Sequence, residues 1–338
     1  MSRPAEIGND SITLAVKSGV NLSRLAPQME LTLGATIEPA SGTLRDFTTV
    51  QYYTVSSEDR QWSKRYAVRV VTGTFTPIEG VVRFDFETIR LQGKADFPYH
   101  VFTVLLPSGE AATEWASGNA GFSLTGMAEG PTDYPTYQSA EGYEGACVEL
   151  VTRSTGQFGN MGGKPMAAGN LFLGRFELSR AMAAPLEATK FGIPMEYEPE
   201  TFSGYYFYEP GATFYVPGSN GLKPVSGRID SCAIYAVFYE STPEAPYLNG
   251  ANVLADDNPQ IVSTAVLSAD ARLATDNWQH FELPFVPRDG KEVDPVKLRQ
   301  GQYNLAIVFS SSAGGASFEG ALGSRLRVDN VEVSFKER

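Results

Sequence analysis

Short strand-like segments, each closed by a turn, follow one another along almost the whole chain and constrain its fold more than any other feature. Examples are NLFLGRFELS (170–179) and YNLAIVFS (303–310), which are rich in apolar and aromatic residues. The 33 glycines and 21 prolines among 338 residues suit the turns between such segments. The only helix-like segment, LSRAMAAPLEATKF (178–191), is interrupted by Pro185. The pattern predicts an all-β protein in which residues 80–338 form a jelly-roll β-sandwich of two antiparallel sheets.

Residues 1–73 predict a smaller β domain ahead of the jelly roll. Leu31 and Leu33 alternate as in a strand, and YYTVSSEDRQWSKRYAVRVV (52–71) predicts two strands around a polar hairpin. These segments favour a sandwich of immunoglobulin size, although the cysteine pair of antibody domains is missing. The Gly, Thr and Pro residues of 72–80 predict the domain boundary.

For two segments, the sequence also predicts the position of the strand in its sheet or an irregularity within the strand. CAIYAVFY (232–239) is apolar or aromatic on both faces, which is typical of a central strand covered on both sides. In the closing segment LRVDNVEVSF (326–335), the apolar residues change parity halfway, so the strand needs a bulge at Asp329-Asn330. We expect Asp329 at this bulge either to bind a cation or to anchor the Ser-Gly loop (310–317) that precedes the strand.

Charge and hydropathy exclude several partners. Lys and Arg number 27 against 39 Asp and Glu, and the net charge of −12 repels phosphate, so nucleic acid is excluded as a partner. No apolar run reaches the roughly 18 residues that a membrane-spanning helix needs. The N-terminal MSRPAEIGND has no apolar signal-peptide core, so export would depend on a targeting segment outside this chain.

Metal and cofactor signals are few. The two cysteines, Cys147 and Cys232, provide neither a disulfide framework nor a cysteine zinc site, and two buried free thiols are the favoured interpretation over a single bridge. Calcium is the one metal considered, with Asp256, Asp257 and Asp329 as candidate ligands, although no EF-hand spacing is present. No other cofactor is expected.

Catalytic motifs are incomplete. The serines at 310–312 lack the Gly-x-Ser-x-Gly elbow between strand and helix, and His100 and His280 are the only histidines that could serve as a base. The strand motif Glu-x-Asp-x-x-Glu of laminarinase-type glucanases is broken in EVDPVK (292–297), where Lys297 replaces the second Glu. The acids left for a glycosidase pair are Glu149, Glu177, Glu319 and Asp329.

Aromatic residues give the positive signal. Aromatic rings gather in FSGYYFYEPG (202–211), and EWASGN (114–119) adds a tryptophan near an amide. Rings that stack on sugar C–H faces, with polar side chains beside them, are typical of glycan sites. Packing in the core is the competing interpretation. The predicted ligand-binding residues are Trp115, Asn119, Arg175, Glu177, Tyr205, Tyr206, Tyr208 and Glu319.

Several segments resemble a known family. ELVTRSTGQFGNMGGKPMAAGNLFLGRFEL (149–178), PLEATKFGIPMEYEPETFSGYYFYEPG (185–211), DSCAIYAVFYE (230–240) and IVFSSSAGGASFEGALGSRLRVDNVEV (307–333) resemble the Putative carbohydrate metabolism domain of Bacteroidetes. Residues 1–73, with LTLGATIEPASGTLRDFTTVQYYTVSSEDRQWSKRYAVRVV (31–71), resemble the Ig-like domain that often precedes it. The resemblance implies a jelly roll similar to carbohydrate-binding modules, and export as a lipoprotein or secreted protein of the cell surface or periplasm. It carries over no catalytic residue.

Three functional hypotheses therefore stay open. The first is a non-catalytic protein that binds oligo- or polysaccharide, the second is a glycoside hydrolase with a carboxylate pair in the jelly-roll cleft, and the third is an adhesive or scaffold protein. For each of them we expect a monomer. A carboxylate pair about 5 to 9.5 Å apart in a groove would favour hydrolysis.

Overall fold

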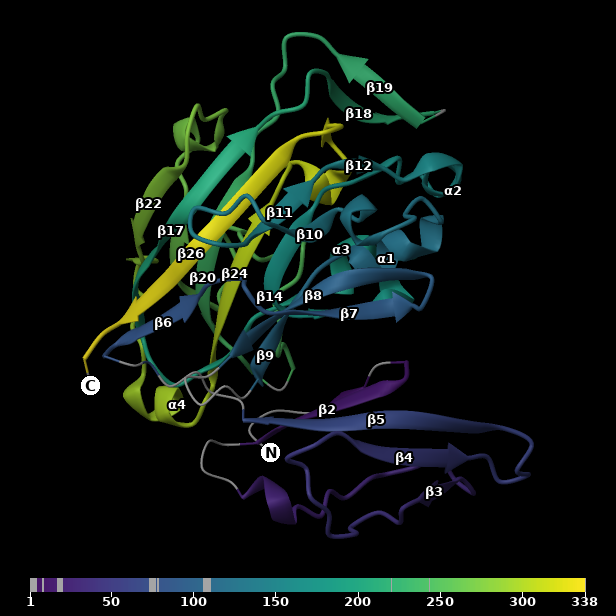
Figure 1. The fold of residues 1–338 in the computed structure, drawn as a ribbon. Helices are drawn as coiled ribbons and strands as arrows, with labels where there is room; N and C mark the ends of the chain where they lie inside the picture. Colours follow the sequence, from purple (N-terminus) through teal and green to yellow (C-terminus); the bar gives the residue numbers. More distant parts are fainter. Residues whose placement is uncertain are drawn as a thin grey trace. The chain divides into compact units, whose positions relative to one another are not determined.

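A computed structural model describes residues 5–7, 9–16, 21–72, 77, 79–105, 111–219, 221–242 and 244–337 (Figure 1). The chain divides into two compact units, Met1–Thr74 and Phe75–Arg338. The boundary predicted at 72–80 falls largely on positions outside the described residues.

The N-terminal unit contains one five-stranded sheet in the order β1-β2-β5-β4-β3. Its elements are β1 (Glu6–Ile7), β2 (Ser11–Val16), the 3-10 helix η1 (Leu22–Arg24), β3 (Thr36–Glu38), β4 (Gln51–Ser56) and β5 (Ser63–Thr72). The predicted hairpin is confirmed, since β4 pairs antiparallel with β5. The strand predicted around Leu31 and Leu33 is wrong: the strand begins at Thr36, and Leu33 is 97% exposed. An immunoglobulin-like sandwich for this unit stays a prediction.

The larger unit is built on two sheets that share one core, and the all-β prediction is confirmed. The six-stranded sheet has the order β10-β11-β26-β17-β22, with β6 paired to β26. Its strands are β6 (Val81–Phe84), β10 (Thr136–Ser139), β11 (Cys147–Val151), β17 (Pro199–Glu209), β22 (Gln279–Pro284) and β26 (Arg325–Phe335). Figure 1 shows β17 and β26 side by side, with β20 and β24 behind them.

The ten-stranded sheet has the order β23-β21-β20-β24-β14-β9-β8-β7, with β15 on β14 and β16 on β24. Its strands are β7 (Ile89–Lys94), β8 (Phe97–Leu105), β9 (Ala111–Ala116), β14 (Asn170–Phe176), β15 (Thr189–Phe191), β16 (Ile193–Met195), β20 (Ala233–Glu240), β21 (Ile261–Val266), β23 (Val286–Pro287) and β24 (Tyr303–Ser310). Its β20 lies between β21 and β24 and is buried on both faces, which confirms the central strand predicted at 232–239.

Short elements connect the two sheets and cover their ends. The remaining strands are β12 (Arg153–Ser154), β13 (Met166–Ala167), β18 (Phe214–Gly218), β19 (Gly221–Val225) and β25 (Gly320–Ala321). The helices are α1 (Asn119–Phe122), α2 (Gly156–Met161), α3 (Pro185–Ala188) and α4 (Pro295–Arg299), and the 3-10 helices are η2 (Ser123–Thr125), η3 (Pro131–Asp133), η4 (Leu178–Arg180), η5 (Asp270–Arg272) and η6 (Gly315–Ser317). Pro185 begins α3, where its missing N–H costs no helical hydrogen bond.

The predicted bulge in the closing strand is confirmed. Ser203 of β17 pairs with Glu332, but Tyr205 pairs with Asp329, so β26 carries one extra residue between these pairs. Asn330 accommodates the bulge by adopting a left-handed φ of 45°, a conformation that Asn tolerates better than most residues. The Asp329 carboxylate accepts backbone N–H groups from Glu144 at 2.9 Å and Asn330 at 2.8 Å. It therefore anchors the loop at 141–145, and the expectation that it anchors the Ser-Gly loop is wrong.

Asp230 anchors the Ser-Gly loop instead. This buried carboxylate accepts the Ser312 hydroxyl at 2.6 Å, the Ser324 hydroxyl at 2.7 Å and the Ala321 N–H at 2.7 Å, all through one oxygen. The Ser311 hydroxyl accepts the Gly169 N–H at 2.9 Å. The serines after β24 therefore satisfy buried polar groups and fix the loop, as the absence of a serine-hydrolase elbow predicts.

The two cysteines are free and buried. Burial raises the pKa of the Cys147 thiol and of the Cys232 thiol, each to about 12. Both thiols are thus protonated at neutral pH and unreactive.

Candidate functional site

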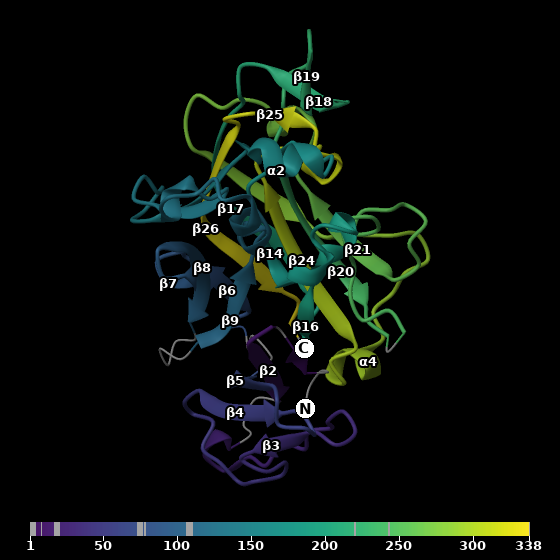
Figure 2. The same ribbon diagram turned by 90° about the vertical axis from the view of Figure 1, so that its right-hand side faces the viewer.

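A pocket of ≈ 260 Å³ lies on the outer face of the ten-stranded sheet. Its floor is formed by Phe172 of β14, Tyr235 of β20 and Val308 of β24. Their chain neighbours, such as Leu171 and Ile307, point the other way into the core between the sheets, because side chains alternate along a strand. Figure 2 looks onto these three strands, with α2 above them.

Segments far apart in the sequence form the walls of the pocket. Phe122 comes from α1, Phe158 from α2 and Phe176 from the end of β14, while Phe318 follows η6. The loop that Asp230 fixes through Ser312 thus forms part of one wall. The aromatic lining residues are Phe122, Phe158, Phe172, Phe176, Phe191, Tyr235 and Phe318. Such a lining offers ring faces and edges to the C–H groups of a ligand.

Tyr235 contributes a hydroxyl-bearing side chain to the pocket lining. Among the described residues its hydroxyl has no hydrogen-bond partner, whereas the Tyr239 hydroxyl on the same strand donates to the Phe191 carbonyl at 2.6 Å and accepts from Asn304 at 2.9 Å. Burial raises the pKa of Tyr235 far above its ordinary value of 10.0, although the charge of Arg272 opposes this rise. The hydroxyl stays protonated at neutral pH and can donate to or accept from a ligand.

Two other lining side chains retain donors that no described residue engages. Asn170 accepts the Gly118 N–H at 2.8 Å and donates to the Ala168 carbonyl at 3.3 Å, which leaves one amide hydrogen. Lys164 donates from its ammonium to the Gly162 carbonyl at 3.0 Å and keeps further donors. Together with Tyr235 they can bind hydroxyl groups of a ligand.

The pocket contains no acidic lining residue within the part of the chain that the structure describes. Glu149 pairs with Arg325 and Arg327, Glu177 with Arg175, and Glu319 with Arg228. Neither these acids nor Asp329 line the pocket. The pair of carboxylates that glycoside hydrolysis requires is therefore not assembled here.

Three aromatic residues predicted to contact a ligand are instead part of the core. Trp115 is 3% exposed and packs with Phe84 and Phe309, at ring-centroid distances of 5.1 Å and 5.9 Å. Tyr206 and Tyr208 point inward and donate to the carbonyls of Ala271 at 2.7 Å and Ser311 at 3.1 Å. These rings have almost no free surface, which agrees with the competing interpretation of core packing, and ligand binding by them stays a prediction without support from the pocket. Tyr205 points to the outer face of the six-stranded sheet and is half-buried.

The predicted polar residues also lie apart from the pocket. Asn119 is buried, donates to the Thr136 carbonyl at 2.7 Å and accepts its N–H at 3.1 Å, so it connects two segments of the fold. Arg175 bonds to Glu177 at 3.0 Å and lies 4.7 Å from the Tyr247 ring centroid. Glu319 bonds to Arg228 at 2.9 Å. Ligand binding by Arg175, Glu177 and Glu319 stays a prediction without support from the pocket.

The calcium candidates do not converge. Asp256 and Asp257 are exposed in the loop before β21, while Asp329 is buried in β26. No group of three or more His, Cys, Asp or Glu side chains in the described ranges could hold a metal ion. Likewise, no described helix is long and apolar enough to cross a membrane.

Sequence reasoning missed the pocket residues. Tyr235 was visible in a strand with two apolar faces, but the sequence does not reveal which face remains accessible. Phe158 and Phe318 lie in glycine-rich segments that predict turns, and nothing local indicates that these turns meet over one sheet.

Comparisons with known proteins place the chain in a family. Residues 85–334 match the family described as Putative carbohydrate metabolism domain, and residues 4–70 match the one described as SGBP, N-terminal. No curated protein matches the chain.

Two solved structures resemble most of the chain. A crystal structure described as "a putative glycoside hydrolase from Bacteroides thetaiotaomicron VPI-5482" is 43% identical, with a TM-score of 0.89, and the match covers 100% of this chain and 94% of that one. A second crystal structure, described as "a putative glycoside hydrolase from Bacteroides vulgatus ATCC 8482", is 39% identical, with a TM-score of 0.69. That match covers 75% of this chain and 98% of the other one. This chain belongs to the Putative carbohydrate metabolism domain family.

Proposed function

We propose that this chain binds glycans without hydrolysing them and that the pocket on the ten-stranded sheet holds one or two sugar rings. The observation that carries the proposal is the pocket itself, which is lined by aromatic rings and by Tyr235, whose hydroxyl has no hydrogen-bond partner among the described residues. Sugars need both features, because their C–H faces stack on rings and their hydroxyls need hydrogen-bond partners. The volume of ≈ 260 Å³ lies just below the range of about 300–1,000 Å³ for pockets that hold larger ligands.

The family supports a carbohydrate-associated role, and the absence of acids from the described lining favours binding over hydrolysis. The N-terminal match to the family described as SGBP, N-terminal also fits a binding protein. We place this role outside the cytoplasm, at the cell surface or in the periplasm, with a lipid anchor as a prediction. The description of both relatives as glycoside hydrolases keeps hydrolysis as the alternative to be tested.

Tyr235→Phe tests the proposal, with Tyr239→Phe as the matched control on the same strand. A glycan array on the full chain would identify a ligand, and calorimetry would measure its dissociation constant. Losing one neutral hydrogen bond costs about 0.5–1.5 kcal/mol, so Tyr235→Phe should weaken binding about 2- to 12-fold while the melting temperature is unchanged. Tyr239→Phe should lower the melting temperature and leave binding unchanged, because its hydroxyl bonds only within the protein.

The same samples distinguish binding from hydrolysis. We expect no increase in reducing ends when the wild-type protein is incubated with the array ligand. Sustained release of reducing ends would overturn the non-catalytic part of the proposal. An array without any bound glycan would favour an adhesive or scaffold role instead.

A further inference from the structure

The outer face of the six-stranded sheet presents a second group of aromatic side chains. This aromatic face consists of Tyr143, Tyr205, Phe207, Trp278 and His280. Tyr205 and Phe207 lie on β17, where alternation directs them outward while Tyr206 and Tyr208 fill the core. The pocket lies on the outer face of the other sheet, so the aromatic face is a separate surface.

The rings of the aromatic face form a continuous set. Tyr143 stacks on Tyr205 with centroids 3.7 Å apart and planes within 9°. Trp278 meets Tyr143 edge-on at 6.2 Å and lies 6.3 Å from Phe207, while His280 lies 5.0 Å from Tyr205. Stacking covers one face of the Tyr143 ring, and the residue remains 44% exposed. Nearly half of the surface of Tyr143 is therefore accessible to a partner.

Hydrogen bonds to the bulge of β26 hold the loop that carries Tyr143. The loop at 141–145 is fixed by Asp329, which accepts the Glu144 N–H, and by Asn330, whose amide donates to the Glu144 carboxylate at 3.0 Å. Asp329 is fully buried, and it sits at the bulge that interrupts β26. The bulge thus serves to place an aromatic ring over the sheet, and a surface whose rings are held in advance loses less entropy on binding.

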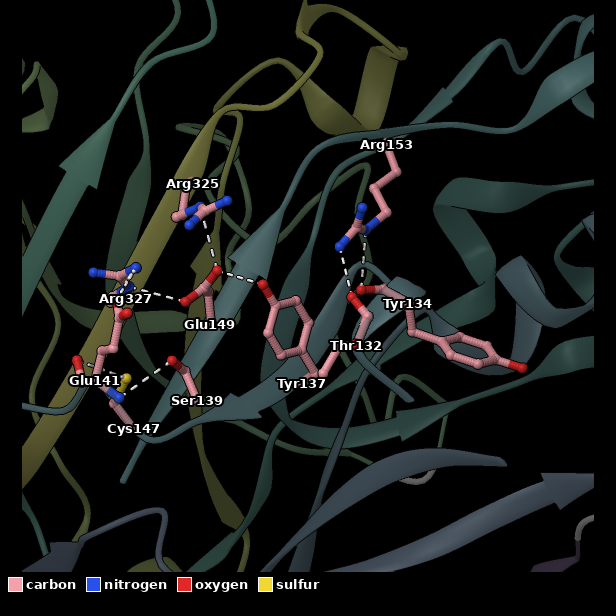
Figure 3. Close-up of polar contacts among 10 residues, drawn as sticks. All are labelled: Thr132, Tyr134, Tyr137, Ser139, Glu141, Cys147, Glu149, Arg153, Arg325 and Arg327. Atoms are coloured by element: carbon pink, nitrogen blue, oxygen red, sulfur yellow. Dashed lines mark hydrogen bonds and ion pairs between the residues drawn. The ribbon is translucent and has the colours of Figure 1, made fainter. Parts of the chain in front are cut away.

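A row of cross-strand neighbours that contains an ion pair lies beside the aromatic face on the same side of the sheet. Tyr137, Glu149 and Arg327 pair in register across β10, β11 and β26, and Phe207 continues the row on β17. Figure 3 shows Tyr137, Arg325 and Arg327 directed at Glu149. The Arg327 guanidinium is engaged by Glu149 and by Glu141, so this row offers little free positive charge to a ligand.

Acidic side chains surround the aromatic face. Glu144 and Glu332 are close enough to Tyr205 to help raise its pKa, after the hydrogen bond with Tyr143 and burial. Glu282 is exposed and pairs in register with Ser203, two residues from Tyr205 along the same side of β17. Glu332 is paired with Arg83, so Glu144 and Glu282 are the carboxylates that repel an anionic polymer and can accept hydrogen bonds from hydroxyl groups.

We propose that the aromatic face is a second carbohydrate-binding surface, which takes a neutral polysaccharide chain. Ring faces suit the C–H faces of pyranoses, and the surrounding carboxylates, the tyrosine hydroxyls and His280 suit their hydroxyl groups. The rings extend from the 141–145 loop across β17 to β22 on an open sheet face, which suits a run of sugar units more than the enclosed end of a chain. A protein partner is disfavoured because carboxylates are depleted at the centres of protein interfaces.

Affinity gel electrophoresis of the full chain tests this proposal. The gels contain laminarin, galactomannan or xyloglucan as neutral polysaccharides, and polygalacturonate as an anionic one. We expect at least one neutral polymer to retard the protein and polygalacturonate to leave it unretarded. Tyr143→Ala and Trp278→Ala should each weaken retardation at least 10-fold, because losing a central aromatic anchor removes most of the contact.

Two control variants distinguish binding at the aromatic face from a general effect of removing a tryptophan and from binding in the pocket. Trp62→Ala removes a 54% exposed tryptophan in the N-terminal unit and should bind like wild type. Ala316→Trp blocks the pocket and should keep its retardation, so failure of the pocket proposal and failure of this one are distinguishable. The proposal is wrong if no neutral polymer retards the protein, if Tyr143→Ala and Trp278→Ala behave like wild type, or if only polygalacturonate binds.

Discussion

Asp230→Asn should destabilise the larger unit by about 4 kcal/mol, with a fall in melting temperature of roughly 10 °C. One carboxylate oxygen accepts three hydrogen bonds, from Ser312, Ser324 and Ala321, and the other accepts the Ser231 N–H at 2.9 Å. Asn has the same shape but no charge, and its NH₂ group cannot accept. At least one buried donor is then left without a partner, and each such loss near a charged group costs about 1.5–3 kcal/mol.

Urea unfolding of Asp230→Asn measures this effect, and Asp256→Asn is its matched control. Asp256 lies in an exposed turn, so its replacement should change the free energy of unfolding by no more than about 0.5 kcal/mol. If Asp230→Asn costs less than about 1 kcal/mol, Asp230 is not the anchor of the Ser-Gly loop. The same variant should also weaken glycan binding, because Ser312 and Phe318 on this loop line the pocket.

Glu149→Gln should cost about 3 kcal/mol of stability at pH 7. The Glu149 side chain is 3% exposed, and it bonds to Arg327 at 2.9 Å and Arg325 at 3.2 Å, with the Tyr137 hydroxyl as a further donor (Figure 3). Gln fills the same space but removes the buried counter-charge of Arg327, itself only 14% exposed, which then keeps only the exposed Glu141 as an ion-pair partner. Removing one member of a buried ion pair is strongly destabilising.

The pH dependence of this variant has a definite sign. Burial raises the pKa of Glu149, but the hydrogen bonds from Tyr137 and Arg327 and the charges of Arg325 and Arg327 outweigh burial and lower it below its usual 4.5. A lowered pKa stabilises the folded state above the unfolded-state pKa and ceases to do so as pH falls through the folded-state value. The difference between wild type and Glu149→Gln should therefore be full at pH 7 and shrink below about pH 4.5.

Unfolding curves at pH 7, 5 and 3.5 check this expectation. Exposed Glu292→Gln serves as the control and should follow the wild type at each pH. A Glu149→Gln deficit that is constant from pH 7 to 3.5 would show that packing, and not charge, explains the loss.

The strands could be predicted because each carries its own pattern. The change of parity between Val328 and Val331 required a bulge, and the structure places it at Asn330. The strand expected around Leu31 and Leu33 failed because two leucines two residues apart do not by themselves specify pairing, and the chain there forms a turn at Leu33-Gly34.

The site could be predicted only in part, because alternation sorts side chains into two groups but does not say which group is the core. Within residues 205–208, alternation correctly separated Tyr205 and Phe207 from Tyr206 and Tyr208. The predicted site nevertheless included Tyr206 and Tyr208, which are buried. Trp115 was included although it is buried, and the polar residues near it in sequence, such as Asn119, are bonded inside the fold. The pocket depends on turns that meet only in three dimensions.

The central claim is that the pocket on the ten-stranded sheet holds the sugar. The most direct measurement is the dissociation constant of an array-identified oligosaccharide for wild type, Ala316→Trp and Tyr143→Ala, with the melting temperature of each. Ala316 is exposed and lines the pocket, so a tryptophan there should obstruct it without disturbing the core. We predict at least 10-fold weaker binding by Ala316→Trp at an unchanged melting temperature, with at most a small change for Tyr143→Ala. Wild-type affinity in Ala316→Trp would contradict the claim.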